Sequence, residues 1–217
     1  MKRVLNFQEA AEMVAPGSRV MIGGFLAVGS PHGIIDALVQ LGTADLTIIA
    51  NDTGFPDRGI GKLIVNRQAS RVIASHIGTN PPTGQQMNAG ELAVELIPQG
   101  TLAEQIRAAG AGLGGILTPT GLGTVAQEGK EVLVVDGKEY ILATPIHADV
   151  ALIKAHKADT DGNLLFRRTA RNFNPLMAMA AKLVLAEVEE IVEVGALDPD
   201  HVVTPGIFVD YLVQEVR

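Results

Sequence analysis

Residues 23–31 are rich in glycine and lie at a strand-to-helix turn, where α/β proteins often bind ligands. The segment follows a short apolar run, residues 20–22, and precedes a stretch with helical periodicity. Backbone N–H groups at such a strand-to-helix turn can receive a phosphate, and glycines let a ligand approach closely. The residues expected to bind a ligand are Gly23, Gly24, Phe25, Leu26, Ala27, Val28 and Gly29.

The glycine spacing limits what that ligand is. It differs from G-x-G-x-x-G, so the segment lacks the dinucleotide-binding fingerprint. The alternative interpretation is a tight turn that binds nothing.

Gln99 occupies a comparable position further along the chain. It lies in a Pro-Gln-Gly-Thr sequence, after a predicted strand (residues 92–97) and before a predicted helix (residues 101–109). A side-chain amide there can donate a hydrogen bond to an oxyanion that develops during a reaction. The alternative is an ordinary surface glutamine in a turn.

Asp52 and His76 are candidates for acid–base chemistry. Each follows a predicted strand, residues 46–50 and 72–74, so the two side chains could meet at the edge of the sheet. The alternative for each is a hydrogen-bonded turn residue. The other histidines have no metal-site spacing and the chain has no cysteine, so we expect no metal, no thiolate chemistry and no disulfide.

Two further features carry no assigned chemistry. Arg167, Arg168 and Arg171 form a basic cluster that could attract phosphates, although ion pairs with the acids of residues 187–193 are the favoured interpretation. Residues 110–129 contain seven glycines, which is too many for a helix, yet the segment is too apolar for a linker. A loop that covers a site or packs against another chain explains this run, and an irregular core connection is the alternative.

Alternating strand and helix patterns must position these candidates. The predicted strands are residues 20–22, 46–50, 72–74, 92–97, 132–135, 140–143, 150–154, 164–166 and 183–187, with a hairpin at Asp136 and Gly137. The predicted helix starts are Asn6 with Glu9, Ser30 with Pro31, Thr101 with Glu104, and Asn174 with Pro175. We therefore predict an open layered α/β domain with a largely parallel central sheet, as a single domain over residues 1–217.

Composition excludes several classes of protein. The 217 residues are 47% hydrophobic and carry a net charge of −7, without a basic stripe, so nucleic acid is not an expected partner. No apolar stretch is long enough to span a membrane, so we expect no membrane-spanning segment. The first residues lack the apolar segment of a secretory signal, and the absence of cysteine fits a reducing compartment, so a cytoplasmic location is expected.

Several segments together resemble the signature of family I coenzyme A transferases, in the α subunit or N-terminal half of these enzymes. They are Gly23-Gly24-Phe25-x-x-x-Gly29-x-Pro31, Asn51-Asp52-Thr53, residues 73–81, residues 98–104, residues 110–112, residues 118–121, and Ala170-Arg171-Asn172-Phe173-Asn174. The resemblance covers nearly the whole chain and implies an α/β domain of the CoA-transferase type.

The resemblance implies a ping-pong reaction through a covalent glutamyl-CoA thioester. In the family, a glutamate attacks the acyl-CoA, an acyl-glutamyl anhydride forms, and the CoA thiolate returns to make the thioester. That glutamate lies in a Ser-Glu-Asn-Gly motif of the β half, which is absent from this sequence. The nucleophile is therefore expected on a β subunit, in an α2β2 assembly, with coenzyme A as substrate and covalent intermediate and no permanently bound cofactor.

The resemblance also implies roles for residues. Residues 23–29 are the expected CoA-binding segment, and Gln99 is the expected oxyanion donor. His32 follows the signature Pro31, where family members often carry a small or acidic residue, so it either alters acyl selectivity or faces solvent. The expected substrates are a short-chain acyl-CoA and a free carboxylate of the acetate, acetoacetate or butyrate type, with the succinyl-CoA:3-oxoacid branch as the alternative.

Two other classes of protein stay open. The chain contains no G-x-S-x-G turn and no P-loop, so no motif indicates an activated nucleophile. We therefore expect the chain to supply only half of an active site. A sugar-phosphate isomerase of related fold would use Asp52 or Glu104 as base. A non-catalytic assembly subunit would use the glycine-rich run only as an interface.

Overall fold

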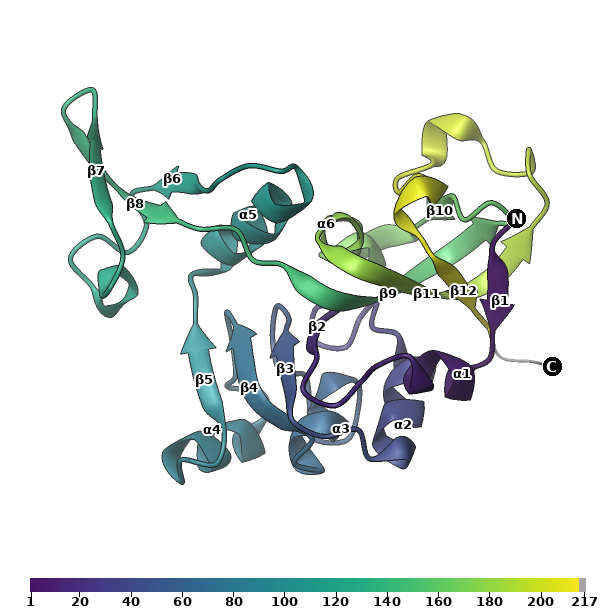
Figure 1. The fold of residues 1–217 in the computed structure, drawn as a ribbon, viewed down its shortest axis with the longest axis horizontal. Helices are drawn as coiled ribbons and strands as arrows, with labels where there is room; N and C mark the ends of the chain where they lie inside the picture. Colours follow the sequence, from purple (N-terminus) through teal and green to yellow (C-terminus); the bar gives the residue numbers. More distant parts are fainter. Residues whose placement is uncertain (215–217) are drawn as a thin grey trace.

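The computed structural model describes residues 1–214, in which a nine-stranded sheet carries helices on both faces (Figure 1). The strand order is β1-β12-β11-β9-β2-β3-β4-β5, and β10 pairs with β9 outside this path. All pairs are parallel except β9 with β10, which confirms the predicted α/β class and parallel sheet. The strands are β1 (Arg3–Leu5), β2 (Arg19–Ile22), β3 (Leu46–Ile49), β4 (Ala69–Ala74), β5 (Ala93–Leu96), β9 (Ala148–Asp159), β10 (Leu164–Leu165), β11 (Ala181–Val192) and β12 (Tyr211–Val213).

Helices α1 to α4 lie on one side of the sheet and α5 and α6 on the other (Figure 1). Their bounds are α1 (Phe7–Glu12), α2 (His32–Leu41), α3 (Ile60–Val65), α4 (Pro81–Asn88), α5 (Gln99–Gly110) and α6 (Asn174–Met179). The chain also forms short 3₁₀ helices, η1 (Val125–Gln127), η2 (Arg168–Arg171), η3 (Pro199–His201) and η4 (Gly206–Phe208).

A second, antiparallel sheet projects from the main body in Figure 1. It has the order β6-β8-β7 and contains β6 (Ile116–Thr118), β7 (Val132–Val135) and β8 (Lys138–Ala143). The predicted hairpin is confirmed, because Val135 pairs with Lys138 across Asp136 and Gly137, which both have positive φ. The glycine-rich run of residues 110–129 belongs to this projection.

The core lies on both faces of the parallel sheet, which explains why its strands are continuous apolar runs. Val20 and Ile22 of β2 belong to one buried cluster with α1, α2 and α3. Met21, between them, belongs to the other cluster with α5 and α6. Both faces of a central strand must therefore be apolar.

Tertiary contacts overrule several predicted helix starts. The Asn6–Glu9 capping box is confirmed, whereas no side chain caps α2, α5 or α6. Thr101 lies inside α5 and its hydroxyl is buried, because this helix starts two residues earlier than predicted. Ser30 and Asn174 have other partners, described below.

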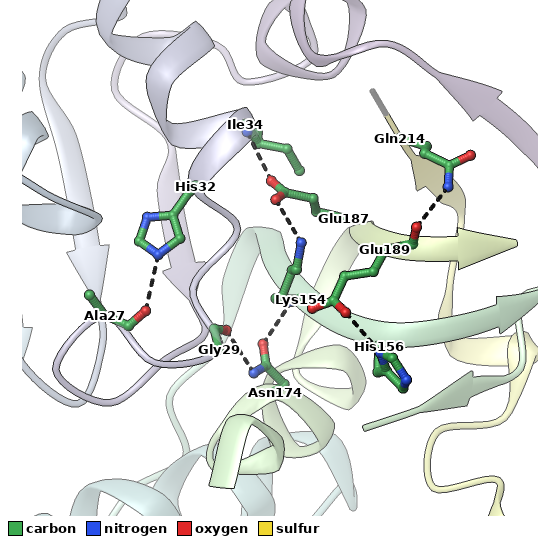
Figure 2. Close-up of polar contacts among 10 residues, drawn as sticks. All are labelled: Ala27, Gly29, His32, Ile34, Lys154, His156, Asn174, Glu187, Glu189 and Gln214. Atoms are coloured by element: carbon green, nitrogen blue, oxygen red, sulfur yellow. Dashed lines mark hydrogen bonds and ion pairs between the residues drawn. The ribbon is translucent and has the colours of Figure 1, made fainter. Parts of the chain in front are cut away.

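A buried ion pair links β9, β11 and α2. The carboxylate of Glu187 on β11 accepts hydrogen bonds from Lys154 Nζ of β9 (3.1 Å) and from the Ile34 N–H at the start of α2 (3.1 Å) (Figure 2). The side chains of Glu187 and Lys154 are only 6% and 21% exposed. Glu187 thus does for α2 what a capping side chain normally does.

We expect from the sequence that the arginines of residues 167–171 pair with the four glutamates of residues 187–193. This prediction is wrong for three of the four glutamates. Glu187, Glu189 and Glu190 pair with Lys154, His156 and Lys157 of the neighbouring strand. The parallel register of β9 and β11 brings these partners together, which the sequence separation conceals.

The Glu187→Gln variant should lose roughly 3 kcal/mol of unfolding free energy, because it leaves the Lys154 ammonium without its buried partner. Glu190→Gln is the matched control, since Glu190 pairs with Lys157 in the same two strands but is half exposed. Its loss should stay below about 1 kcal/mol. Urea unfolding at pH 7 measures both, and equal losses would contradict this account of Glu187.

Candidate functional site

The carboxyl ends of β2, β3, β4 and β5 lead to a pocket of about 460 Å³. Its lining residues are Phe25, Leu26, Asn51, Asp52, Ser75, His76 and Gln99. Ligand sites of open α/β sheets lie outside these strand ends. Three candidates from separate parts of the sequence therefore come together: residues 23–29, the pair Asp52 and His76, and Gln99.

Residues 23–29, called the glycine turn below, form a tight hairpin at this pocket. Phe25 and Val28 exchange backbone hydrogen bonds of 3.0 and 2.9 Å. Leu26 and Ala27 between them have φ angles of 47° and 68°. This left-handed conformation costs roughly 1–2 kcal/mol for each non-glycine residue, so the surrounding structure must hold the turn.

Asn172 holds the middle of the glycine turn from a distant segment. Its Oδ1 accepts a hydrogen bond from the Gly24 N–H (3.1 Å), and its Nδ2 donates to the Val28 carbonyl (2.9 Å). Gly24 has a φ of +127°, and a Cβ added at this position would collide with the Ser30 hydroxyl. Ser30 is thus buried against the turn instead of capping α2 as predicted.

Asn174 holds the end of the glycine turn. Its Nδ2 donates to the Gly29 carbonyl (3.0 Å), and its Oδ1 accepts from the Lys154 N–H (2.9 Å) (Figure 2). The side chain is fully buried, and a Cβ at Gly23 would overlap its Oδ1. Asn174 therefore supports the turn rather than capping α6, and the segment around it, to which no role was assigned from sequence, is the base of the site.

Most N–H groups of the glycine turn are used within the protein. Hydrogen bonds to other protein groups are donated by the N–H groups of Gly23, Gly24, Phe25, Leu26 and Val28. At the N-terminus of α2, the Ile34 N–H donates to Glu187 and the His32 N–H donates to the Ser30 carbonyl. These groups are not available to a phosphate in this structure, and the turn instead exposes the apolar side chains of Phe25 (46%) and Val28 (50%).

Asp52 is buried beneath the pocket, and its carboxylate accepts three hydrogen bonds. Oδ1 accepts from the Gly54 N–H (2.7 Å), and Oδ2 accepts from the Leu26 N–H (2.9 Å) and Asn51 Nδ2 (2.7 Å). Asp52 and His76 do lie side by side, because their backbones form a parallel bridge. The carboxylate is nevertheless directed at the turn and Asn51, so the predicted acid–base pair does not form in the described structure.

Gln99 is the first residue of α5 and is exposed at the pocket. Its Nε2 lies 3.4 Å from Asn51 Oδ1, which also lies 3.3 Å from Ser75 Oγ. Sequence reasoning assigned no role to Asn51 or Ser75. The signal that could have found them is their position, since each lies just after a strand of the parallel sheet, as Asp52 and Gln99 do.

The remaining candidates lie outside the pocket lining. His32 Nε2 is 3.1 Å from the Ala27 carbonyl, so this side chain contacts the glycine turn (Figure 2). Glu104 pairs with Arg107 along α5, and the arginines of residues 167–171 are exposed. Within residues 1–214, no helix is long and apolar enough to cross a membrane, and no cluster of acidic or histidine side chains is arranged to hold a metal.

Comparison with known proteins supports a specific family. The model of the family described as "Coenzyme A transferase" matches residues 4–215. The chain is 54% identical to the acetate CoA-transferase subunit alpha of Escherichia coli K12 over 211 residues, which is 97% of this chain and 96% of that one. It is 49% identical to the acetoacetyl-CoA:acetate/butyrate CoA transferase alpha subunit of Clostridium acetobutylicum, with 98% of both chains covered.

A solved structure shares the fold. The acyl-CoA transferase of Escherichia coli O157:H7, in a thioester complex with CoA, superposes with a TM-score of 0.89 at 24% identity. The match covers 99% of this chain but 47% of that chain, so this protein spans about half the length of the solved enzyme.

Gly23→Ala should lower the free energy of unfolding by about 1–3 kcal/mol, because the added methyl overlaps the buried Asn174 amide. Gly84→Ala in α4 is the control, since a Cβ there meets nothing within 4 Å. That variant should be neutral or up to about 1 kcal/mol more stable. Thermal and urea unfolding measure both, and a Gly23→Ala protein as stable as the parent would refute the packing described.

Proposed function

This chain belongs to the coenzyme A transferase family as an α subunit, and from that premise we propose the reaction that it serves. The chain moves CoA between a short-chain acyl-CoA and a free carboxylate, through a glutamyl-CoA thioester on a β subunit. Gln99 donates to the oxyanion, and the glycine turn, residues 23–29, contacts CoA.

The composition of the pocket carries this proposal. A primary-amide donor, Gln99, faces a pocket beside an exposed apolar turn. The single carboxylate among the described lining residues, that of Asp52, is already bound by three donors. These lining residues offer a donor but no free carboxylate, so the carboxylate of the proposed mechanism must come from outside them.

The proposed steps follow from acyl-transfer chemistry. The β-subunit carboxylate attacks the thioester carbonyl, whose oxygen gains negative charge beside the Gln99 amide. Expulsion of the CoA thiolate leaves an acyl-glutamyl anhydride. The thiolate then attacks the glutamyl carbonyl, which releases the first carboxylate and forms glutamyl-CoA. A second carboxylate reverses these steps and leaves as the new acyl-CoA.

The lining also favours a short uncharged acyl group. Among the described lining residues there is no lysine or arginine to receive the second carboxylate of a succinyl group. The two relatives above are named for acetate and for acetoacetyl-CoA with acetate or butyrate. We therefore propose this substrate class ahead of the succinyl-CoA:3-oxoacid alternative.

The proposal also covers the oligomeric assembly of the protein and its location in the cell. Residues 1–217 serve as one CoA-transferase domain that joins a β subunit, in an α2β2 complex. Names that call relatives alpha subunits support such a partner. The complex acts in the cytoplasm, in short-chain fatty acid and ketone body metabolism, without a permanently bound cofactor.

The purified chain alone should show no CoA transfer from acetoacetyl-CoA to acetate. Addition of the β subunit should restore it, whereas a β subunit with the motif glutamate changed to glutamine should not. The physical reason is the missing nucleophile. Robust transfer by the 217-residue chain alone would overturn this assignment.

Gln99→Ala should lower kcat of the reconstituted complex by about 100- to 1000-fold, the usual cost of one lost oxyanion donor. Gln99→Glu should be at least as harmful, because it places a negative charge beside the forming oxyanion. Gln40→Ala, an exposed glutamine of α2, is the control and should leave kcat unchanged.

Circular dichroism and gel filtration confirm folding and assembly of these variants. A near-normal kcat for Gln99→Ala would remove Gln99 from the mechanism. It would also favour the alternative that this chain is a non-catalytic assembly subunit.

A further inference from the structure

We propose that Asp52 is a positioning residue for the transferase reaction and acts on Gln99 through Asn51. Its carboxylate determines which end of the Gln99 side-chain amide faces the pocket. The inference rests on the proposed function, because it takes Gln99 as the oxyanion donor, and it assigns a role to a buried carboxylate that the proposed chemistry leaves unused.

The relay of hydrogen bonds begins with a group that can only accept. The Asp52 side chain is 3% exposed, and its two oxygens receive the N–H groups of Gly54 and Leu26. An ionised carboxylate has acceptor sites and no donor. Any amide that contacts it must therefore present its NH₂ group.

This requirement sets the orientation of Asn51. Its side chain is buried, and Nδ2 lies 2.7 Å from Asp52 Oδ2. Rotating the amide by half a turn would place Oδ1 at hydrogen-bond distance from the carboxylate. This is unfavourable, because both groups are acceptors. Asn51 Oδ1 is consequently directed away from Asp52, toward Ser75 Oγ and Gln99 Nε2.

The orientation of Asn51 in turn selects that of Gln99. Its Nε2 lies 3.4 Å from Asn51 Oδ1, and the reversed amide would set two carbonyl oxygens against each other. With one N–H directed at Asn51, the second N–H of the same nitrogen is left to donate to an oxyanion. A reversed Gln99 would present Oε1 and repel the developing charge.

The same carboxylate oxygen also reaches the glycine turn. Asp52 Oδ2 accepts both Asn51 Nδ2 and the N–H of Leu26, whose φ is 47°. One buried acceptor thus connects the strained turn with the catalytic amide. A 3.4 Å contact is long for a hydrogen bond, and such contacts tighten when substrate closes a site.

The test is a double-mutant cycle on the reconstituted complex, with acetoacetyl-CoA and acetate as probes. Asp52→Asn keeps the shape but offers an NH₂ group where only an acceptor stood, so Asn51 and Gln99 can reverse. We expect kcat to fall about 10- to 100-fold. In a Gln99→Ala background the same substitution should change kcat little, because no amide is left to orient.

Asn51→Ala provides the second arm of the test. It removes the middle of the relay but leaves the Asp52 contacts to Gly54 and Leu26 in place. Its kcat loss should also vanish in the Gln99→Ala background, while KM for acetoacetyl-CoA stays near the parent value. This arm decides the question if Asp52→Asn fails to assemble.

Asp159→Asn is the matched control. Asp159 is a buried carboxylate that also accepts two backbone N–H groups and one asparagine amide, but at the far end of β9, outside the pocket lining. Its replacement should lower stability and leave kcat unchanged. A comparable kcat loss for Asp159→Asn would show that replacing any buried aspartate lowers kcat, and would overturn the inference.

Two outcomes separate the inference from the proposed function. If Asp52→Asn and Asn51→Ala reduce kcat by equal factors with and without Gln99, the relay is wrong and the donor role of Gln99 stands. If Gln99→Ala alone leaves kcat intact, the donor role falls, and the inference falls with it.

Discussion

The glycine turn exists only because side chains from elsewhere satisfy its backbone, and the geometry of the pocket depends on those hydrogen bonds. Leu26 and Ala27 adopt a left-handed conformation that neither residue favours. Asn172, Asn174 and Asp52 all make hydrogen bonds to the backbone of the turn. Since these contacts come from within the protein, the turn is held in place while the apolar side chains of Phe25 and Val28 stay exposed.

Two buried carboxylates share this supporting role. Glu187 binds the N-terminus of α2 together with Lys154, and Asp52 binds the turn and Asn51. Glu187 accepts two hydrogen bonds and Asp52 accepts three, all from groups of this chain. A carboxylate engaged in this way is poorly placed to attack a substrate, which supports the proposal that the reactive glutamate belongs to a partner chain. In that proposal the α chain contributes hydrogen-bond donors instead.

Local sequence signals failed where a distant partner competed for the same side chain. Ser30 and Asn174 have the residue types of helix caps, yet Ser30 packs against Gly24 and Asn174 bonds to Gly29 and the Lys154 N–H. The Asn6–Glu9 box formed as predicted, since both of its hydrogen bonds are local. The same distinction separates the confirmed Asp136–Gly137 hairpin from the arginine cluster, whose expected acids pair across β9 and β11.

The sequence by itself determined the class of fold and the candidates of the site. Runs such as residues 20–22 must be buried on both faces, and polar residues such as Asp52 and Gln99 follow the strands directly, so a parallel sheet with a site at its carboxyl edge could be inferred. Only the tertiary structure decided what each residue does there. Asp52 faces Asn51 and Leu26 rather than His76, because the order of the strands brings the glycine turn beside it. The turn itself is held by Asn172, which lies 144 residues from Val28 in the sequence. Such partners leave no periodic pattern in the chain.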